Sequence, residues 1–99
     1  MITPDDIREE LKSVKDPELD LDIVTLGLVR GIAVDEDGTG AEITMTLTSP
    51  FCPFANELIE EVEEKAGALF QGEEGSVRVE ITFDPPWEPP AGVREMLGL

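Results

Sequence analysis

The sequence contains no histidine and no tyrosine, and its 99 residues include a single cysteine, Cys52. The missing imidazole matters because a nucleophilic cysteine usually works beside a histidine or in an electropositive setting. The surroundings here are acidic, so a cysteine-dependent enzyme is disfavoured and we expect no enzymatic activity. One cysteine also cannot form an internal disulfide, which agrees with a reducing compartment.

Basic residues are scarce as well. The chain has 23 Asp and Glu against 7 Lys and Arg, a net charge of -16. Such a surface repels phosphate backbones and anionic lipid headgroups, so we expect no nucleic acid and no membrane partner. No apolar run reaches the roughly 18 residues of a membrane span, and the first residues lack the pattern of a secretory signal. We therefore expect a cytoplasmic protein, and we interpret the acidity as the hypothesis of a high-salt habitat.

The length predicts one domain over residues 1–99. Thr3 is a plausible N-cap with Pro4 at the first helical position, and the apolar stripe Ile7, Leu11 and Val14 predicts a helix that ends near Lys15. From Phe54 onward, apolar residues recur at helical spacing, with glutamates around the other side. The pattern therefore predicts a first helix and a long central one.

Strand patterns occupy the rest of the chain. Alternating apolar residues predict strands at Leu26 to Val34, Ala41 to Thr48 and Val77 to Phe83. The polar, glycine-containing stretch Asp35 to Gly40 predicts a hairpin turn. A calcium-binding loop that started at Asp35 would have Thr46 at its twelfth position, where such a loop needs a glutamate, so we dismiss a calcium site. A proline-rich turn and a short helix ending at Leu97 complete the order α-β-β-α-β-α. We therefore predict an α+β (two-layer α/β) fold, with helices on one face of a three-stranded mixed sheet and the third strand parallel to the second.

Cys52 lies between Pro50 and Pro53, where the second strand pattern gives way to the central helix. If Pro53 is the first helical residue, Cys52 occupies the N-cap position, where its sulfur lies near the unpaired amides of the helix start. A helix terminus contributes about 0.3 to 1 kcal/mol, less than the roughly 1.4 kcal/mol of one pKa unit. The helix alone therefore does not make Cys52 strongly nucleophilic, whereas a bound metal itself removes the thiol proton. Two interpretations stay open from the spacing alone, a metal ligand and a buried structural cysteine.

Two further stretches are unusual. Asp16 and Glu18 flank Pro17, which disfavours helical geometry at Asp16 and places both acids in a loop, where the simplest role is a solvated turn cap. Gly27, at the predicted start of the first strand, indicates a bulge or a close backbone approach. The proline-dense segment after the third strand carries the only tryptophan, Trp87. Trp87 either pins the C-terminal turn to the domain or offers an aromatic contact to a partner.

Four runs taken together resemble one family, the metal-sulfur (iron-sulfur) cluster assembly domain of SufT-like and PaaD-like proteins. In this sequence they read Asp16-Pro17-Glu18-Leu19, Ile23-Val24-Thr25-Leu26-Gly27-Leu28-Val29, Thr46-Leu47-Thr48-Ser49-Pro50-Phe51-Cys52-Pro53 and Phe83-Asp84-Pro85-Pro86-Trp87. Their order and spacing match the family over nearly the whole chain.

The resemblance implies an α/β domain similar to other iron-sulfur assembly domains, and a role in maturing iron-sulfur proteins as a carrier or adaptor. It also implies that Cys52 is the cluster-associated thiol and that a surface cleft around it is lined by Asp16, Glu18, Thr48 and Ser49. Two departures stand out. Phe51 is bulky where many relatives have a small residue, and the cysteine-rich C-terminal extension of fuller PaaD-like proteins is not in this sequence.

A cluster usually needs four thiolates or their substitutes, and this chain offers one sulfur. We therefore expect transient binding of an iron-sulfur cluster, with Cys52 from two chains in a homodimer, or Cys52 plus a partner or small thiol, as ligands. The partners would be iron-sulfur client or assembly proteins. The alternative is a metal-free interaction module, accessory to an oxygenase or to the assembly machinery, that uses the Trp87 segment as its contact surface.

Overall fold

The computed structural model describes residues 2–16, 20–48, 55–71, 76–84, 86–88 and 90–97. Its elements follow the predicted order with one short 3-10 helix added after the central helix. They are α1 (Pro4–Leu11), β1 (Val29–Val34), β2 (Ala41–Met45), α2 (Ala55–Gly67), η1 (Ala68–Phe70), β3 (Val77–Ile81) and α3 (Ala91–Leu97). None of the helices in these ranges is long and apolar enough to cross a membrane.

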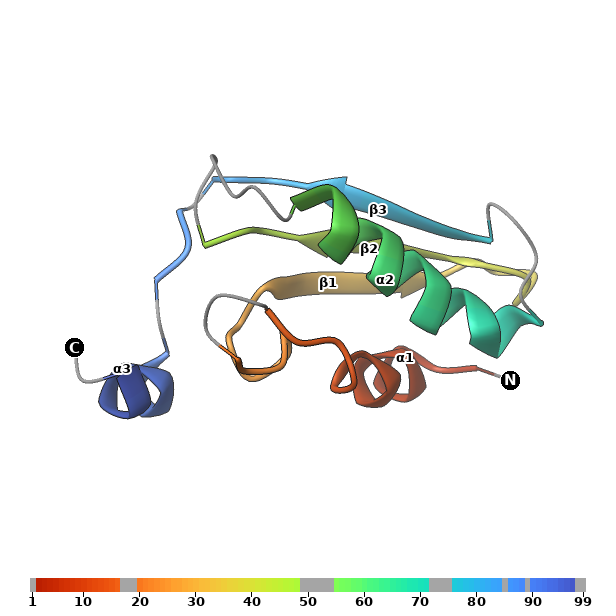
Figure 1. Cartoon of the computed structure of the whole chain (residues 1–99). Helices are drawn as coiled ribbons and strands as arrows, with labels where there is room; N and C mark the ends of the chain where they lie inside the picture. Colours follow the sequence, from red (N-terminus) through yellow and green to blue (C-terminus); the bar gives the residue numbers. More distant parts are fainter. Residues whose placement is uncertain are drawn as a thin grey trace.

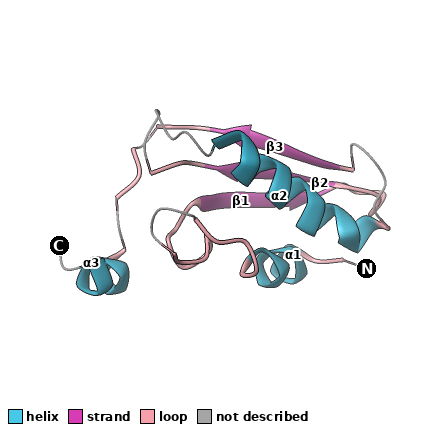
Figure 2. Ribbon diagram, viewed as in Figure 1, coloured by secondary structure: helices cyan, strands magenta, loops and turns pink. Residues whose placement is uncertain are grey.

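The sheet is mixed, as predicted. Its strand order is β1-β2-β3, with β1 antiparallel to β2 and β2 parallel to β3. Figure 1 shows α2 lying across the sheet and α1 beside it, and Figure 2 shows the same layers by element type. The predicted α+β fold is therefore confirmed. The third helix, α3, lies beyond one end of the sheet in Figure 1.

The core fills the space between the sheet and the helices. The inward residues of β2 and β3 pack with buried residues of both long helices and of the loop before β1. The cluster comprises Ile7, Leu11, Val14, Ile23, Leu26, Leu28, Val29, Ala41, Ile43, Met45, Leu47, Leu58, Val62, Ala66, Phe70, Val77 and Val93. Burying side chains of this kind stabilises the fold by about 1.5 to 3 kcal/mol for each large one.

The first helix begins as predicted but ends earlier. Thr3 accepts a hydrogen bond from the Asp6 amide at 3.2 Å, and its own amide donates to the Asp6 carboxylate at 2.9 Å. This reciprocal cap satisfies two amides that a helix start leaves unpaired. The helix ends at Leu11 rather than near Lys15, because the amides of Ser13 and Val14 donate to carbonyls three residues back and the chain turns.

The three strands are also shorter than predicted. The residues Leu26 to Leu28 form a turn before β1, and β2 and β3 end at Met45 and Ile81. Thr46 departs from the predicted alternation, since its side chain is fully buried. Its amide donates to the Leu28 carbonyl at 2.8 Å, so the chain beyond β2 is held against the turn before β1.

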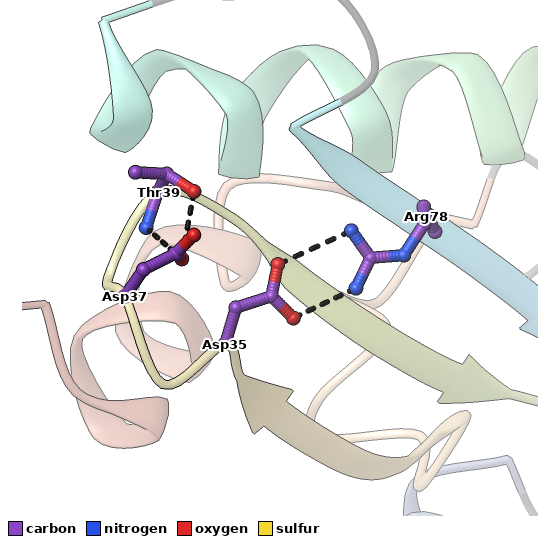
Figure 3. A network of polar contacts seen from close by, with 4 residues as sticks. All are labelled: Asp35, Asp37, Thr39 and Arg78. Atoms are coloured by element: carbon purple, nitrogen blue, oxygen red, sulfur yellow. Dashed lines mark hydrogen bonds and ion pairs between the residues drawn. The ribbon is translucent and has the colours of Figure 1, made fainter.

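The hairpin between β1 and β2 is confirmed, and polar contacts hold it (Figure 3). Arg78 of β3 donates to both carboxylate oxygens of Asp35, at 2.8 and 3.3 Å. The Asp37 carboxylate accepts from the amide and the hydroxyl of Thr39, at 3.0 and 2.7 Å, and these bonds lower its pKa. The carboxylates of Asp35 and Asp37 are therefore engaged within the protein.

Candidate functional site

The described parts of the four sequence motifs gather at one end of the sheet. We define the motif end as the end where β1 begins at Val29 and where β2 and β3 finish at Met45 and Ile81. It is opposite the hairpin of Figure 3, because that hairpin joins the end of β1 to the start of β2. Two amide bonds hold the segments together here, from Thr46 to the Leu28 carbonyl and from Thr82 to the Met45 carbonyl at 2.9 Å.

Asp16 lies in a tight loop that joins α1 to the motif end. Its amide donates to the Leu21 carbonyl and its carbonyl accepts from the Asp20 amide, both at 2.9 Å. The Ile23 amide donates to the Val14 carbonyl at 2.9 Å, which ties the loop to the turn before β1. Asp16 is only 2% exposed, so the prediction of a solvated loop acid is wrong for this residue. Sequence spacing alone does not reveal this burial.

The run Ile23 to Val29 folds as a single capped helical turn that leads into β1. The Asp22 carboxylate accepts from the amides of Val24 and Thr25, at 3.1 and 2.9 Å. At the other end, Gly27 donates to Val24 and Leu28 donates to Ile23, with Gly27 at φ +74. This is the arrangement in which a glycine ends a helix in the left-handed region. The turn buries Ile23, Leu26 and Leu28 in the core.

Gly27 also confirms the prediction of a close backbone approach. A Cβ placed on Gly27 would lie 3.3 Å from the Pro90 ring. The predicted alternative at this position, a bulge, occurs instead at Arg30. The C-terminal segment is thus seated directly on the turn before β1.

Trp87 also holds the C-terminal segment against the turn before β1. Its indole N–H donates to the Leu26 carbonyl at 2.7 Å, and its half-buried ring packs against the core. This contact agrees with a pinning role. The use of Trp87 by a partner stays a prediction. Phe83, which follows β3, is 40% exposed at the same end.

Of the predicted cleft residues, Thr48 is half-buried and lies three positions beyond the end of β2. Glu18, Ser49 and Cys52 lie outside the described residues, as does the predicted start of the central helix at Phe54. Within the described ranges, no group of three or more potential metal ligands is present. A common cleft of Asp16, Glu18, Thr48 and Ser49 therefore stays a prediction, and so does the role of Cys52.

A family model described as iron-sulfur cluster assembly protein matches residues 4–81 of the chain. This range includes every element from α1 to β3 and three of the four motif runs in full. The chain belongs to the iron-sulfur cluster assembly protein family.

Individual relatives agree with this family. A Bacillus subtilis protein named Fe-S protein maturation auxiliary factor YitW is 45% identical, over 84% of this chain and 78% of its own length. One from Staphylococcus aureus named Fe-S protein maturation auxiliary factor SufT is 39% identical, over 75% of this chain and 81% of its own. The resemblance to SufT-like proteins is therefore confirmed.

Solved structures support the fold as well. A conserved hypothetical protein from Thermotoga maritima matches with a TM-score of 0.80 and 40% identity, covering 99% of this chain and 96% of that one. This iron-sulfur cluster assembly family chain therefore shares its whole described fold with an independently determined structure.

Sequence reasoning missed one residue at the motif end of this family member, Arg30. It occupies a β-bulge between Val29 and Gly31, and its Nη1 nitrogen is buried, with no hydrogen-bond partner in the part of the chain that the structure describes. A signal was available, because Arg30 is the only Lys or Arg between Lys15 and Lys65. A lone basic residue inside a strand pattern of such an acidic chain is unusual enough to single out.

Proposed function

We propose that this protein is an iron-sulfur protein maturation factor that holds a cluster transiently through Cys52 and passes it to client proteins. The observation that carries the proposal is family membership over residues 4–81, together with relatives named as Fe-S protein maturation auxiliary factors. Cys52 is the one cysteine in the sequence and lies inside the matched range. The cluster is cargo in this proposal rather than a resident cofactor.

The ligand count decides how the cluster would be held. Protein-bound clusters usually take four thiolates or equivalent ligands, and each chain supplies one. The remaining ligands must therefore come from outside, either Cys52 of a second copy or a small thiol or partner side chain. A cluster held by so few protein ligands leaves readily, which suits transfer.

The described structure supports this proposal because hydrogen bonds hold the segments of the motif end together. The turn before β1, the chain after β2 and the segment around Trp87 are fastened to one another by backbone and indole hydrogen bonds. Thr48 is the last described residue after β2 and precedes Cys52 by four positions in the sequence. A transfer site needs a firm platform beside its labile ligand, because misplacement of the cargo slows handover.

Anaerobic reconstitution with iron and sulfide tests the proposal. We expect the wild type to gain iron and visible absorption, and Cys52→Ser to gain neither. Ser13→Ala is the control, because it removes a hydroxyl from an exposed side chain outside the four motif runs and keeps the thiol. Equal iron and identical spectra in wild type and Cys52→Ser would eliminate Cys52 as a ligand.

The same preparations test the alternative function. A wild type that takes up no iron, yet still captures iron-sulfur clients or assembly proteins, would favour a metal-free interaction module. Size-exclusion chromatography with light scattering, before and after reconstitution, distinguishes a shared cluster between two copies from a cluster completed by a small thiol. A dimer that forms only with the cluster supports the first arrangement.

A further inference from the structure

The hairpin turn of Figure 3 contains the one Asp-Gly step of the sequence, Asp37-Gly38. Such a step is chemically vulnerable because glycine has no side chain to shield its amide nitrogen. The Gly38 nitrogen can attack Cγ, the side-chain carboxyl carbon of Asp37, and close a five-membered succinimide ring. The turn between β1 and β2 therefore holds a candidate site of spontaneous backbone modification.

The reaction needs only water as a co-reactant. A bond forms between the Gly38 nitrogen and Cγ of Asp37, the nitrogen loses its proton, and one side-chain oxygen leaves as water. A water molecule then reopens the ring. Where it breaks the bond between the nitrogen and the main-chain carbonyl carbon of Asp37, the product is isoaspartate. Isoaspartate has the mass of aspartate, but its main chain runs through the side chain and is one carbon longer.

Thr39 holds the carboxylate that this reaction attacks. Oδ1 of Asp37 accepts hydrogen bonds from the Thr39 amide at 3.0 Å and from the Thr39 hydroxyl at 2.7 Å (Figure 3). Both bonds are made to a charged acceptor, and such bonds are stronger than those to a neutral carbonyl. Ring closure removes that charge. The two bonds therefore stabilise the aspartate relative to the succinimide.

The same two bonds keep the carboxyl group ionised. The Thr39 hydroxyl and then the Thr39 amide lower the pKa of Asp37, and the charge of Arg78 acts in the same direction. Ring closure proceeds from the neutral acid, because an ionised carboxylate is a poor electrophile. A lowered pKa reduces the neutral fraction at every pH above it. The folded turn therefore contains less of the reactive form than the unfolded chain does.

The attacking nitrogen is engaged as well. The Gly38 amide donates to the Asp35 carbonyl at 2.9 Å, and the Asp35 amide donates to the Gly40 carbonyl at 2.9 Å. Gly38 has φ +72, a conformation that glycine adopts without strain. The nitrogen must lose its proton to attack Cγ, and this proton is held in a hydrogen bond. Both reacting groups are thus restrained in the folded turn.

We propose that the hairpin between β1 and β2 suppresses the conversion of Asp37 to isoaspartate, with Thr39 as the positioning residue. The proposal is independent of the proposed function, because the hairpin lies at the end of the sheet opposite the motif end. Suppression protects the fold. An extra main-chain carbon at Asp37 would displace the bond from Gly38 to Asp35, the residue that also pairs with Arg78.

Ageing of the purified protein tests the proposal. Wild type is incubated at a fixed, mildly acidic pH, well below its melting temperature, both folded and in enough urea to unfold it. Isoaspartate in the digested samples is distinguished from aspartate by fragmentation in a mass spectrometer, because the two have equal masses. We expect the folded protein to form isoaspartate at least about tenfold more slowly than the unfolded chain, since the restraining bonds are charge-assisted.

Substitutions of Thr39 test its part in the suppression. Thr39→Val keeps the shape of the side chain without the hydroxyl, and the folded variant should form isoaspartate about fivefold faster than folded wild type. Thr39→Ser keeps a hydroxyl donor and should stay as slow as wild type. All three proteins should react equally fast in urea, where the turn is absent. The exposure of Thr39 favours folding of both variants.

A third variant separates Thr39 from general loosening of the hairpin. Arg78→Met breaks the ion pair with Asp35 and leaves Thr39 in place, so it should accelerate the reaction less than Thr39→Val does. Equal acceleration by the two variants would overturn the role of Thr39, and so would a Thr39→Ser variant as fast as Thr39→Val. Equal rates in folded and unfolded wild type would overturn the whole proposal. That wild-type comparison decides alone if Thr39→Val does not fold.

Discussion

Asp22 shows how a single side chain organises the turn before β1. Burial raises the pKa of its carboxyl group, but hydrogen bonds from Thr25 and from the Val24 amide outweigh this and lower the pKa overall. The ionised form is therefore favoured in the folded protein. An aspartate that accepts amides at the start of a helical turn acts as an N-cap.

We predict that Asp22→Ala lowers the free energy of unfolding by about 1 kcal/mol at neutral pH, the usual effect of losing a cap. Because the folded pKa is lowered, the stabilisation is fully present above the unfolded value of about 3.9 and disappears as the pH falls through the folded value. The difference between wild type and variant should therefore shrink below about pH 4. Urea unfolding at a series of pH values measures it.

The control for this experiment is Glu36→Ala, which removes the same charge from an exposed position in the hairpin turn. It should leave stability within about 0.5 kcal/mol of wild type. A stability difference for Asp22→Ala that persists unchanged to pH 3 would contradict the ionised cap.

At the scale of elements, the C-terminal segment depends on a few directed contacts. Trp87 donates to the carbonyl of Leu26, and Pro90 lies against Gly27, so the segment leading to α3 is seated on the turn before β1. The helix itself has only seven residues. Isolated helices of that length are unstable in water, so α3 depends on this seating.

We predict that Trp87→Phe destabilises the protein by about 1 kcal/mol, because the ring is kept while the hydrogen bond to the buried Leu26 carbonyl is lost. Hydrogen exchange of amides in α3 should accelerate in the same variant. Phe83→Leu is the matched control, since Phe83 is exposed and should tolerate the change. Unchanged exchange in α3 after Trp87→Phe would show that the helix is held by other contacts.

At the scale of the whole molecule, the dominant property is charge. The exposed side of α2 alone carries the glutamates Glu57, Glu60, Glu63 and Glu64, and the net charge is -16. Like charges three and four positions apart on a helix repel, and a high net charge opposes compactness. Added salt weakens both effects because it shortens the screening length.

We predict that the free energy of unfolding rises when NaCl is increased from about 10 mM to about 150 mM, where the Debye length falls from about 30 to about 8 Å. Urea unfolding at each salt concentration tests this. A Glu60→Gln, Glu64→Gln variant should depend less on salt, because it removes two like charges from one helix face. Equal stability of the wild type at both concentrations would argue against the high-salt habitat.

Hydrophobic patterns predicted the elements well and their ends poorly. Ile7, Leu11 and Val14 are all buried as the helical stripe requires, yet α1 stops at Leu11. Val14 lies beyond the helix end and is still buried, and its carbonyl accepts a hydrogen bond from the Ile23 amide, a contact that is not local in the sequence. Thr46 is a second example: the alternation placed it on the outer face, yet it is buried and its amide donates to the Leu28 carbonyl.

The sequence by itself determined the order of elements, the mixed sheet and the family, because hydrophobic period, turn residues and motif spacing are local properties of the chain. Only the tertiary structure decided that Asp16 is buried, that Trp87 is bonded to Leu26, and that Arg30 sits in a bulge. It also showed that the Arg30 Nη1 nitrogen has no hydrogen-bond partner among the described residues. These features arise where segments distant in sequence meet at the motif end. The hydrogen-bond partners of a polar group at the motif end come from these distant segments, and no local sequence pattern shows which segments meet.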